Sequence, residues 1–312
     1  MPKPEKTTVN IMSSCVKMAV NYITERKRKV AGIPRILTVQ DISCVGQCSA
    51  TVALPVISAC GVEACIMPSA ILSTHTGGFH GFTFRDLTAD MPGIERHWLS
   101  EGIRFQAVSS GYLASTTQID IVRDVMDRLL LPGGVKIVDP AMADHGKLYY
   151  GFDQAFVEKM SELCAAADYI LPNLTEACFL TGTPYRQEIR EPGEIRVLLE
   201  KLGALGPAAV VLKGISAADG KIGNAVYDVK KGSVRYYFTQ RIEKNSHGTG
   251  DCFAAAFTGA LMRGLDAFDA MVLATDFVVE CLRQTMMDPE HWYGISFERA
   301  LPLLIRRLEK QS

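Results

Sequence analysis

Short runs of apolar residues alternate with longer amphipathic stretches along most of the chain. Ile36 to Gln40 is the first such run, and similar runs recur between polar or glycine-containing turns. Apolar runs of four to eight residues bounded by turn signals are typical of buried strands. The predicted strands span residues 36–40, 63–67, 105–109, 135–138, 169–171, 208–212, 223–229 and 234–238.

The segments between these strands carry apolar residues at helical spacing. The predicted helices span residues 48–60, 86–101, 116–131, 154–166, 252–261, 267–286 and 297–309. Lys230 to Ser233 separates the last two strands and indicates a hairpin. Alternating strands and helices are typical of a mostly parallel sheet with helices on its faces. We therefore expect an α/β fold of three layers, α/β/α, forming one domain over residues 34–312.

Residues 1–33 differ in character from the rest of the chain. Their basic residues, which outnumber two acidic ones, are Lys3, Lys6, Lys17, Arg26, Lys27, Arg28 and Lys29. Apolar residues between Val9 and Ile23 recur at helix-like spacing. The segment lacks the apolar core and small-residue cleavage site of a secretory signal. We predict a basic, helical N-terminal extension.

Composition and charge restrict the class of partner. The chain is 48% apolar and 21% charged, which is enough apolar sequence for a large core. Its 33 basic and 34 acidic residues give a net charge of −1, so it offers no field for nucleic acid or an anionic membrane. No apolar run approaches the roughly 20 residues of a membrane span. We expect a small-molecule partner.

The nine cysteines indicate a reducing compartment. Their number is odd, they form no Cys-x2-Cys pair, and most lie in apolar runs. Such cysteines are typical of buried free thiols in a cytoplasmic protein, and they argue against a zinc site. Histidines gather in the predicted loops, but they lack helical ligand spacing, so we interpret them as hydrogen-bond partners.

The stretch from Asn245 to Phe257 carries the clearest candidate chemistry. Gly248, Gly250 and Asp251 lie directly before or at the start of a predicted helix without a polar side. Glycine allows a positive φ or close approach to a ligand, and the first N–H groups of a helix have no partner within it. The stretch predicts a phosphate site at a helix N-terminus, with Asp251 as acceptor of a proton from an attacking hydroxyl.

Another interpretation of this stretch stays open, because aspartate is also a preferred N-cap and Gly-x-Gly is common in packing turns. Two better-known phosphate motifs are missing. The chain has no Gly-x4-Gly-Lys-Ser/Thr sequence, and Phe253 stands where a dinucleotide-binding fingerprint requires a small residue. A nucleotide would have to be bound in another way.

Polar residues also follow three other predicted strands. Asp139 and Asp144 follow the strand at 135–138, Asn173 to Glu176 follow the strand at 169–171, and Lys213 follows the strand at 208–212. Ligands of open α/β sheets bind outside the carboxyl ends of the strands, and Mg²⁺ takes one or two carboxylates together with phosphate oxygens. Taken singly, the same residues also fit an Asp-Pro turn, a helix cap and a surface lysine.

The order of these clusters, with the glycine–aspartate helix start last, resembles the ribokinase-like superfamily and, more closely, the pyridoxal and pyridoxamine kinases. The resemblance covers the chain from about Pro34 to the C-terminus. Its markers are residues 73–76, 110–113, 138–144, 172–176 and 245–251. It implies a ribokinase-like fold, a cytoplasmic homodimer, and ATP-dependent phosphorylation of the 5′-hydroxymethyl group of pyridoxal, pyridoxamine or pyridoxine with Mg²⁺. It leaves open a requirement for a monovalent cation such as K⁺.

The resemblance also implies roles for individual residues. Asp251 would be the catalytic base and contact the substrate, while N–H groups of Gly248, Thr249 and Gly250 would bind the transferring phosphoryl group. The residues that would bind ATP or its Mg²⁺ are Asp139, Asp144, Asn173, Glu176 and Lys213, with Asp139, Asp144 and Glu176 as the metal group. Asp41 and Thr76 fall where the family contacts the pyridine ring.

Some positions depart from the family pattern and affect substrate preference. Asp41 stands where many relatives have serine, and Gly77 where some have glutamine. A carboxylate at position 41 could pair with a pyridinium N–H. The first alternative is a hydroxymethylpyrimidine kinase, and the second is a non-catalytic nucleotide- or B6-binding protein. The second is disfavoured, because a sensor has no use for a proton acceptor beside the phosphate.

Overall fold

The computed structural model describes residues 32–186, 192–217, 220–243, 246–288 and 290–310. The chain divides into two compact units, Met1–Ile33 and Pro34–Ser312. Nearly all of the predicted basic extension and Asn245 of the glycine–aspartate stretch lie outside the described residues.

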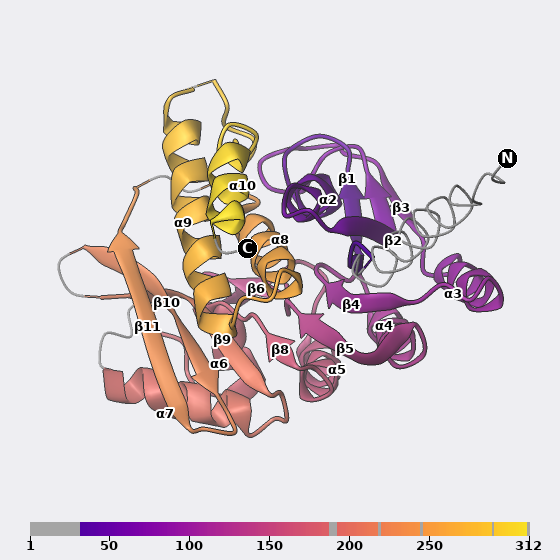
Figure 1. The fold of residues 1–312 in the computed structure, drawn as a ribbon, viewed down its shortest axis with the longest axis horizontal. Helices are drawn as coiled ribbons and strands as arrows, with labels where there is room; N and C mark the ends of the chain where they lie inside the picture. The colour runs from indigo at the N-terminus through magenta and orange to yellow at the C-terminus, as the bar shows by residue number, and fades with distance from the viewer. Residues whose placement is uncertain (1–31, 187–191, 218–219, 244–245, 289, 311–312) are drawn as a thin grey trace, which may run out of the picture. The chain divides into compact units, whose positions relative to one another are not determined.

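The second unit is built on a nine-stranded sheet (Figure 1). Its strands are β1 (Arg35–Ser43), β2 (Glu63–Leu72), β3 (Phe84–Asp86), β4 (Phe105–Ser110), β5 (Leu130–Val138), β8 (Tyr169–Ile170), β9 (Ala209–Ser216), β10 (Lys221–Asp228) and β11 (Ser233–Gln240). The spatial order is β11-β10-β9-β8-β5-β4-β1-β2-β3. The strands from β2 to β9 in this order are parallel, whereas β3, β10 and β11 run antiparallel to their neighbours. The predicted mostly parallel sheet and the hairpin are confirmed.

Alternation along the strands divides the core into two apolar layers. In β1, Ile36 belongs to one buried cluster and Leu37 and Val39 to the other, as the two-residue period of a strand requires. The Leu37 side packs against α3 (Met91–Ser100), α4 (Thr116–Arg128), α5 (Gln154–Ala165), α6 (Leu174–Thr181) and α7 (Pro192–Gly203). The Ile36 side packs against α2 (Ala50–Ala59), α8 (Thr249–Met262), α9 (Ala267–Met286) and α10 (Leu301–Glu309). The predicted α/β/α layers are therefore confirmed.

Several element bounds differ from the sequence prediction; the helix predicted at 116–131, for example, ends at Arg128, and Leu130 begins β5. The helix predicted from residue 86 begins at Met91, because residues 84–86 form β3 and pair with the edge of β2. Helix α7 is not among the predicted elements, although Ile195, Leu198, Leu199 and Leu202 bury one face of it. Its Pro192-Gly193 start looks like a loop in the sequence, yet proline is well accommodated in the first turn of a helix.

The strand order creates a switch point beside β1. The chain passes from β1 to β2 on one side and then crosses to β4 on the other side of β1. Ligand sites in open α/β sheets lie at such points, outside the carboxyl ends of the strands. A two-stranded ribbon of β6 (Ala143–Asp144) and β7 (Lys147–Leu148) follows β5 at the same edge.

Two further expectations, on membrane spans and on cysteines, concern the part of the chain that the structure describes. None of its helices combines the length and apolar character that crossing a membrane requires. Its eight cysteines are free thiols.

Candidate active site

Helix α8 begins with an N-terminus that no side chain caps. Its N-cap residue, Gly248, has a φ of 85°, a left-handed conformation that favours glycine. A Cβ atom at Gly248 would lie 2.0 Å from the carbonyl oxygen of Gln47, so both φ and packing require glycine. The helix is apolar and buried along most of its length. Its first N–H groups and the positive end of its dipole therefore form a site suited to an anion.

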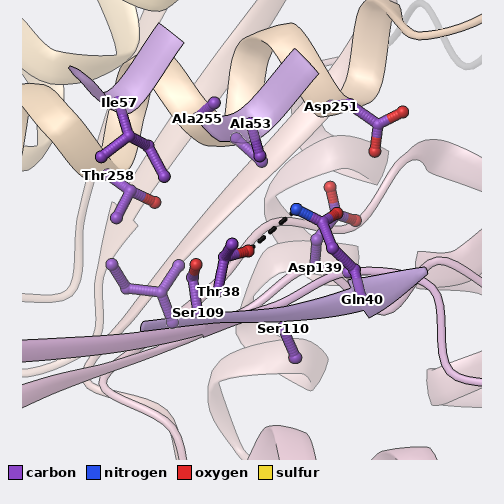
Figure 2. Close-up of a pocket in the computed structure, with 13 residues that line it drawn as sticks. Thr38, Gln40, Ala53, Ile57, Ser109, Ser110, Asp139, Asp251, Ala255 and Thr258 are labelled. Carbon is purple, nitrogen blue, oxygen red and sulfur yellow. Dashed lines mark hydrogen bonds between the residues drawn. The ribbon is translucent and has the colours of Figure 1, made fainter. Parts of the chain in front are cut away.

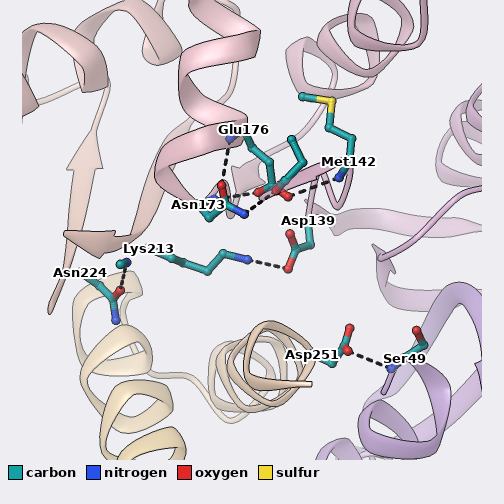
Figure 3. Close-up of polar contacts among 10 residues, drawn as sticks. Ser49, Asp139, Met142, Asn173, Glu176, Lys213, Asn224 and Asp251 are labelled. Carbon is teal, nitrogen blue, oxygen red and sulfur yellow. Dashed lines mark hydrogen bonds and ion pairs between the residues drawn. The ribbon is translucent and has the colours of Figure 1, made fainter. Parts of the chain in front are cut away.

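Asp251, the third residue of α8, is bound to the start of a second helix. Its Oδ2 accepts a hydrogen bond of 2.9 Å from the backbone N–H of Ser49, the residue before α2 (Figure 3). Burial raises the pKa of Asp251 to about 6, although the Ser49 N–H opposes this change. The carboxylate is thus fixed in place and is basic enough to accept a proton near neutral pH.

The loop that carries Ser49 has an unusual backbone. Gln47 and Ser49 have φ values of 58° and 54°, and among described residues other than glycine only His145 shares this feature. Positive φ is costly for such residues and is often found at functional sites. Here it directs the Gln47 carbonyl to Gly248 and the Ser49 N–H to Asp251.

Lys213 brings a positive charge to the start of α8. Its Nζ lies 2.7 Å from Oδ2 of Asp139, and both side chains are largely buried. The same Nζ lies 3.9 Å from the position that a Cβ atom would take at Gly250. Burial opposes the charge on Lys213, but the carboxylates of Asp139 and Glu176 outweigh it and raise the pKa of the ammonium group. The lysine therefore stays protonated beside the helix tip.

Helix α6 starts at the same edge of the sheet but carries a side-chain capping box. Oδ1 of Asn173 accepts the N–H of Glu176 at 2.9 Å, and Oε2 of Glu176 accepts the N–H of Asn173 at 2.7 Å. Oε1 of Glu176 also accepts the N–H of Met142 at 3.3 Å, and Nδ2 of Asn173 donates to the carbonyl of Ala143 at 2.9 Å. Burial raises the pKa of Glu176 to about 8. These residues join α6 to the loop after β5.

The predicted metal group is only partly brought together. Asp139 and Glu176 are buried and close enough to perturb each other electrostatically, whereas the side chain of Asp144 is 56% exposed. Asp144 accepts the N–H of His145 at 2.8 Å. In the described residues, no three acidic, histidine or cysteine side chains lie close enough together to hold a metal ion on their own. Such a cage is not required for Mg²⁺, which usually keeps several waters and takes few protein ligands.

Charge at this edge favours a cation. Asp139 interacts electrostatically with both Glu176 and Asp251, and all three carboxylates interact with the ammonium group of Lys213. Isolated buried carboxylates are unfavourable unless paired or bound to a metal. The donor set therefore fits a divalent cation that arrives with phosphate oxygens.

Asp41 and Thr76 occupy different environments near the end of β1. Asp41 is buried and accepts a 2.9 Å hydrogen bond from Ser43 Oγ, and burial raises its pKa. Thr76 is exposed on the loop of residues 73–81. The neighbouring His75 accepts the N–H of Gly77 at Nδ1, so its Nε2 donates to the carbonyl of Tyr293 at 2.5 Å. His75 thereby ties this loop to the segment that precedes α10.

A small cavity lies between α8 and the sheet (Figure 2). Asp139, Asp251 and Gln40 lie toward one end of it, and Ile57 and Thr258 toward the other. The empty space in and around it, which includes space open to solvent, is about 340 Å³. Nε2 of Gln40 donates to Thr38 within this space. The cavity therefore extends from the space between α8 and the sheet to the carboxylates of Asp139 and Asp251, at the switch point beside β1.

Several residues that shape the site were not predicted from the sequence. Ser49 and Gln47 contact α8 across about 200 positions of sequence, and Tyr293 contacts His75 across 218. All three contacts use the backbone of these residues, so their side-chain types gave no signal. Only the neighbouring glycines, Gly46 and Gly294, indicated tight loops, and each would place a Cβ atom in contact with another loop of this group.

Comparison with known proteins shows which family the chain resembles. Residues 52–295 match the family described as phosphomethylpyrimidine kinase. A hydroxymethylpyrimidine/phosphomethylpyrimidine kinase from Mycobacterium leprae is 30% identical over 230 residues, which cover 72% of this chain and 79% of that protein.

Two solved structures share the fold closely. A pyridoxal kinase from Lactobacillus plantarum has a TM-score of 0.82 and 30% identity, covering 89% of this chain and 99% of its own. A candidate phosphomethylpyrimidine kinase from Bacteroides thetaiotaomicron, crystallised with pyridoxal, has a TM-score of 0.83 and 33% identity, covering 88% and 96%. The family match over residues 52–295 and the similarity to these relatives show that the chain belongs to the phosphomethylpyrimidine kinase family of ribokinase-like phosphotransferases.

Proposed function

We propose that the protein transfers the terminal phosphoryl group of ATP to the 5′-hydroxymethyl group of a vitamin B6 vitamer: pyridoxal, pyridoxamine or pyridoxine. The observation that carries this proposal is the uncapped start of α8 with the fixed carboxylate of Asp251 beside it. An anion site and a proton acceptor at one helix tip are what phosphorylation of an alcohol requires. A sensor without turnover would need only the anion site.

Each residue has a definite part in the proposed transfer. The alcohol oxygen attacks the terminal phosphorus, its proton passes to the carboxylate of Asp251, and the bond to the ADP oxygen breaks. The N–H groups of Gly248, Thr249 and Gly250 stabilise the negative charge on the transferring group, a contribution of about 3 kcal/mol per donor. Lys213 and Asn173 contact the phosphates of ATP.

Asp139, Glu176 and Asp144 are the proposed protein ligands of Mg²⁺, either directly or through water. When bound, Mg²⁺ offsets the charge of the phosphate oxygens. The ammonium group of Lys213 forms an ion pair with Asp139 and offsets part of the negative charge of the carboxylates. Asp144 is the most exposed of the three, so its contribution would be through water.

A B6 vitamer is favoured as acceptor by two lines of support. The similar structure from Lactobacillus plantarum is named a pyridoxal kinase, and that from Bacteroides thetaiotaomicron was solved with pyridoxal. Asp41 adds a buried carboxylate that can accept the N–H of a pyridinium ring. Hydroxymethylpyrimidine is the second candidate acceptor, because the Mycobacterium leprae relative and the family description name pyrimidine kinases.

An ADP-release assay with pyridoxal, pyridoxamine, pyridoxine and hydroxymethylpyrimidine tests the proposal. We expect turnover with at least one B6 vitamer at a kcat/KM at least tenfold above that for the pyrimidine. A preference for hydroxymethylpyrimidine would contradict the B6 assignment, and ATP binding without ADP release from any of the four would contradict catalysis. Asp41→Ser should raise the KM for the preferred vitamer, and an unchanged KM would exclude the pairing of Asp41 with the ring.

A further inference from the structure

A β-bulge in β9 sets the direction of Lys213. In the ladder between β9 and β10, Leu212 is opposite Ala225 and Ile215 is opposite Gly223. Two residues of β9, Lys213 and Gly214, therefore stand opposite one residue of β10, Asn224. Bulges bend a strand and redirect side chains, and they are frequent next to active sites.

The bulge leaves one backbone donor without a partner in the ladder, and the side chain of Asn224 accepts it. Gly214 has a φ of 75°, and its N–H donates to Oδ1 of Asn224 at 3.0 Å (Figure 3). Lys213 is fixed from the other side, since its own N–H donates to the carbonyl of Pro172 at 2.9 Å. The backbone at Lys213 is thus held on one side by β10 and on the other by the segment that follows β8.

Asn224 is in turn held by α9. Its Nδ2 donates to Oγ1 of Thr275 at 2.8 Å, and the hydroxyl of Thr275 donates to the carbonyl of Met271 at 2.7 Å. Asn224 and Thr275 are only 8% and 6% exposed. In this series of three hydrogen bonds the Asn224 side chain accepts at Oδ1 and donates at Nδ2, which fixes the orientation of its amide. Because both side chains are buried, solvent cannot easily replace a lost bond.

We propose that Asn224 and Thr275 are positioning residues, which act through the Gly214 turn to hold the Lys213 ammonium between Asp139 and the start of α8. This inference rests on the proposed function, in which Lys213 contacts the phosphates of ATP. Neither residue is assigned a contact with the nucleotide. Their effect is to fix the lysine in the geometry that the bound phosphates require, so that little ordering is needed when the nucleotide binds.

The test is the dissociation constant of the non-hydrolysable analogue AMP-PCP with Mg²⁺, measured by calorimetry on the full chain. Lys213→Met, Asn224→Ala and Thr275→Val should each weaken binding, with Asn224→Ala weakening it roughly tenfold, as expected for loss of a buried hydrogen bond. Thr181→Val is the matched control, because Thr181 makes the same bond to a carbonyl four residues back at the far end of α6. This control should bind AMP-PCP as the wild type does.

A double-mutant cycle separates positioning from general destabilisation. If Asn224 acts through Lys213, Asn224→Ala should weaken binding by less than twofold in a Lys213→Met background. Full additivity would overturn the proposal, and so would an unchanged dissociation constant for Lys213→Met or for both Asn224→Ala and Thr275→Val. If Asn224→Ala does not fold, the same double-mutant cycle is measured with Thr275→Val and Lys213→Met. Failure of the proposed function gives a different result from failure of this inference, because the wild-type protein would then release no ADP in the kinase assay.

Discussion

The starts of α6 and α8 carry an acid at the same position but use it in opposite ways. Glu176 and Asp251 are each the third residue of a helix that begins at the carboxyl edge of the sheet. Glu176 accepts backbone N–H groups of Asn173 and Met142, and together with Asn173 it forms the capping box of α6. Asp251 turns to the Ser49 N–H of another helix and leaves the α8 terminus open. The difference shows that a helix start becomes a candidate phosphate site when its acid is engaged elsewhere.

Replacing Asp251 by Asn should have the largest effect, because it removes the proton acceptor and keeps the size of the side chain. We expect kcat to fall by about 10²- to 10⁴-fold, with the affinity for AMP-PCP within threefold of the wild type. Asp269→Asn is the matched control, since Asp269 is an exposed acid at the third position of α9. Steady-state ADP release measures both. A tenth or more of wild-type kcat in Asp251→Asn would show that it is not the base.

Gly248→Ala should abolish the open helix start by steric means. The new Cβ would overlap the Gln47 carbonyl and would impose a φ of 85° on alanine. We expect kcat to fall about 100-fold as the N–H groups move. Gly182→Ala is the control, because Gly182 at the end of α6 has a φ of 61° but open space around it. It should cost about 1 kcal/mol in the free energy of unfolding and leave kcat unchanged. Equal kcat values for the two variants would contradict the assignment.

The pH dependence of kcat/KM should show an acidic limb set by Asp251. The base must be ionised, and burial raises its pKa to about 6 in the protein. Activity should therefore be constant above about pH 7 and fall about tenfold per unit below pH 6 as the carboxyl group becomes protonated. The residual activity of Asp251→Asn should lack this limb, and reassay at pH 7.5 after incubation at low pH controls for denaturation. A limb near pH 4 would mean that burial does not tune this group.

Asn173→Ala should have the smallest effect of the four. In the proposed function Asn173 contacts the phosphates of ATP, so the change should weaken ATP binding as well as lower stability. It removes the α6 cap and the bond to the Ala143 carbonyl, so we expect a loss of about 1 to 2 kcal/mol in the free energy of unfolding. Asp153→Ala removes a simple cap from α5 and should cost about 1 kcal/mol. Urea denaturation measures both. A smaller loss in Asn173→Ala than in Asp153→Ala would show that the α6 cap does not hold the loop after β5.

The sequence predicted those parts of the molecule that depend on local pattern. Alternation of apolar runs gave most of the strands and helices, and the glycines before Asp251 indicated the start of α8. Local pattern could not give the pairing of Ser49 with Asp251, the bulge at Lys213 or the closure of α6 by Glu176 onto Met142. These contacts depend on backbone groups brought together by strand order, and backbone groups are identical in every residue type except proline.

The central claim is that the open start of α8, and not the capped start of α6, binds the terminal phosphoryl group. A crystal structure of the full chain with AMP-PCP, Mg²⁺ and pyridoxal tests it most directly. The account predicts terminal phosphate oxygens at hydrogen-bond distance, about 3 Å, from N–H groups of Gly248 to Gly250, with the alcohol oxygen next to the Asp251 carboxylate. A terminal phosphate bound away from α8, or an alcohol on the far side of the phosphate from Asp251, would contradict it.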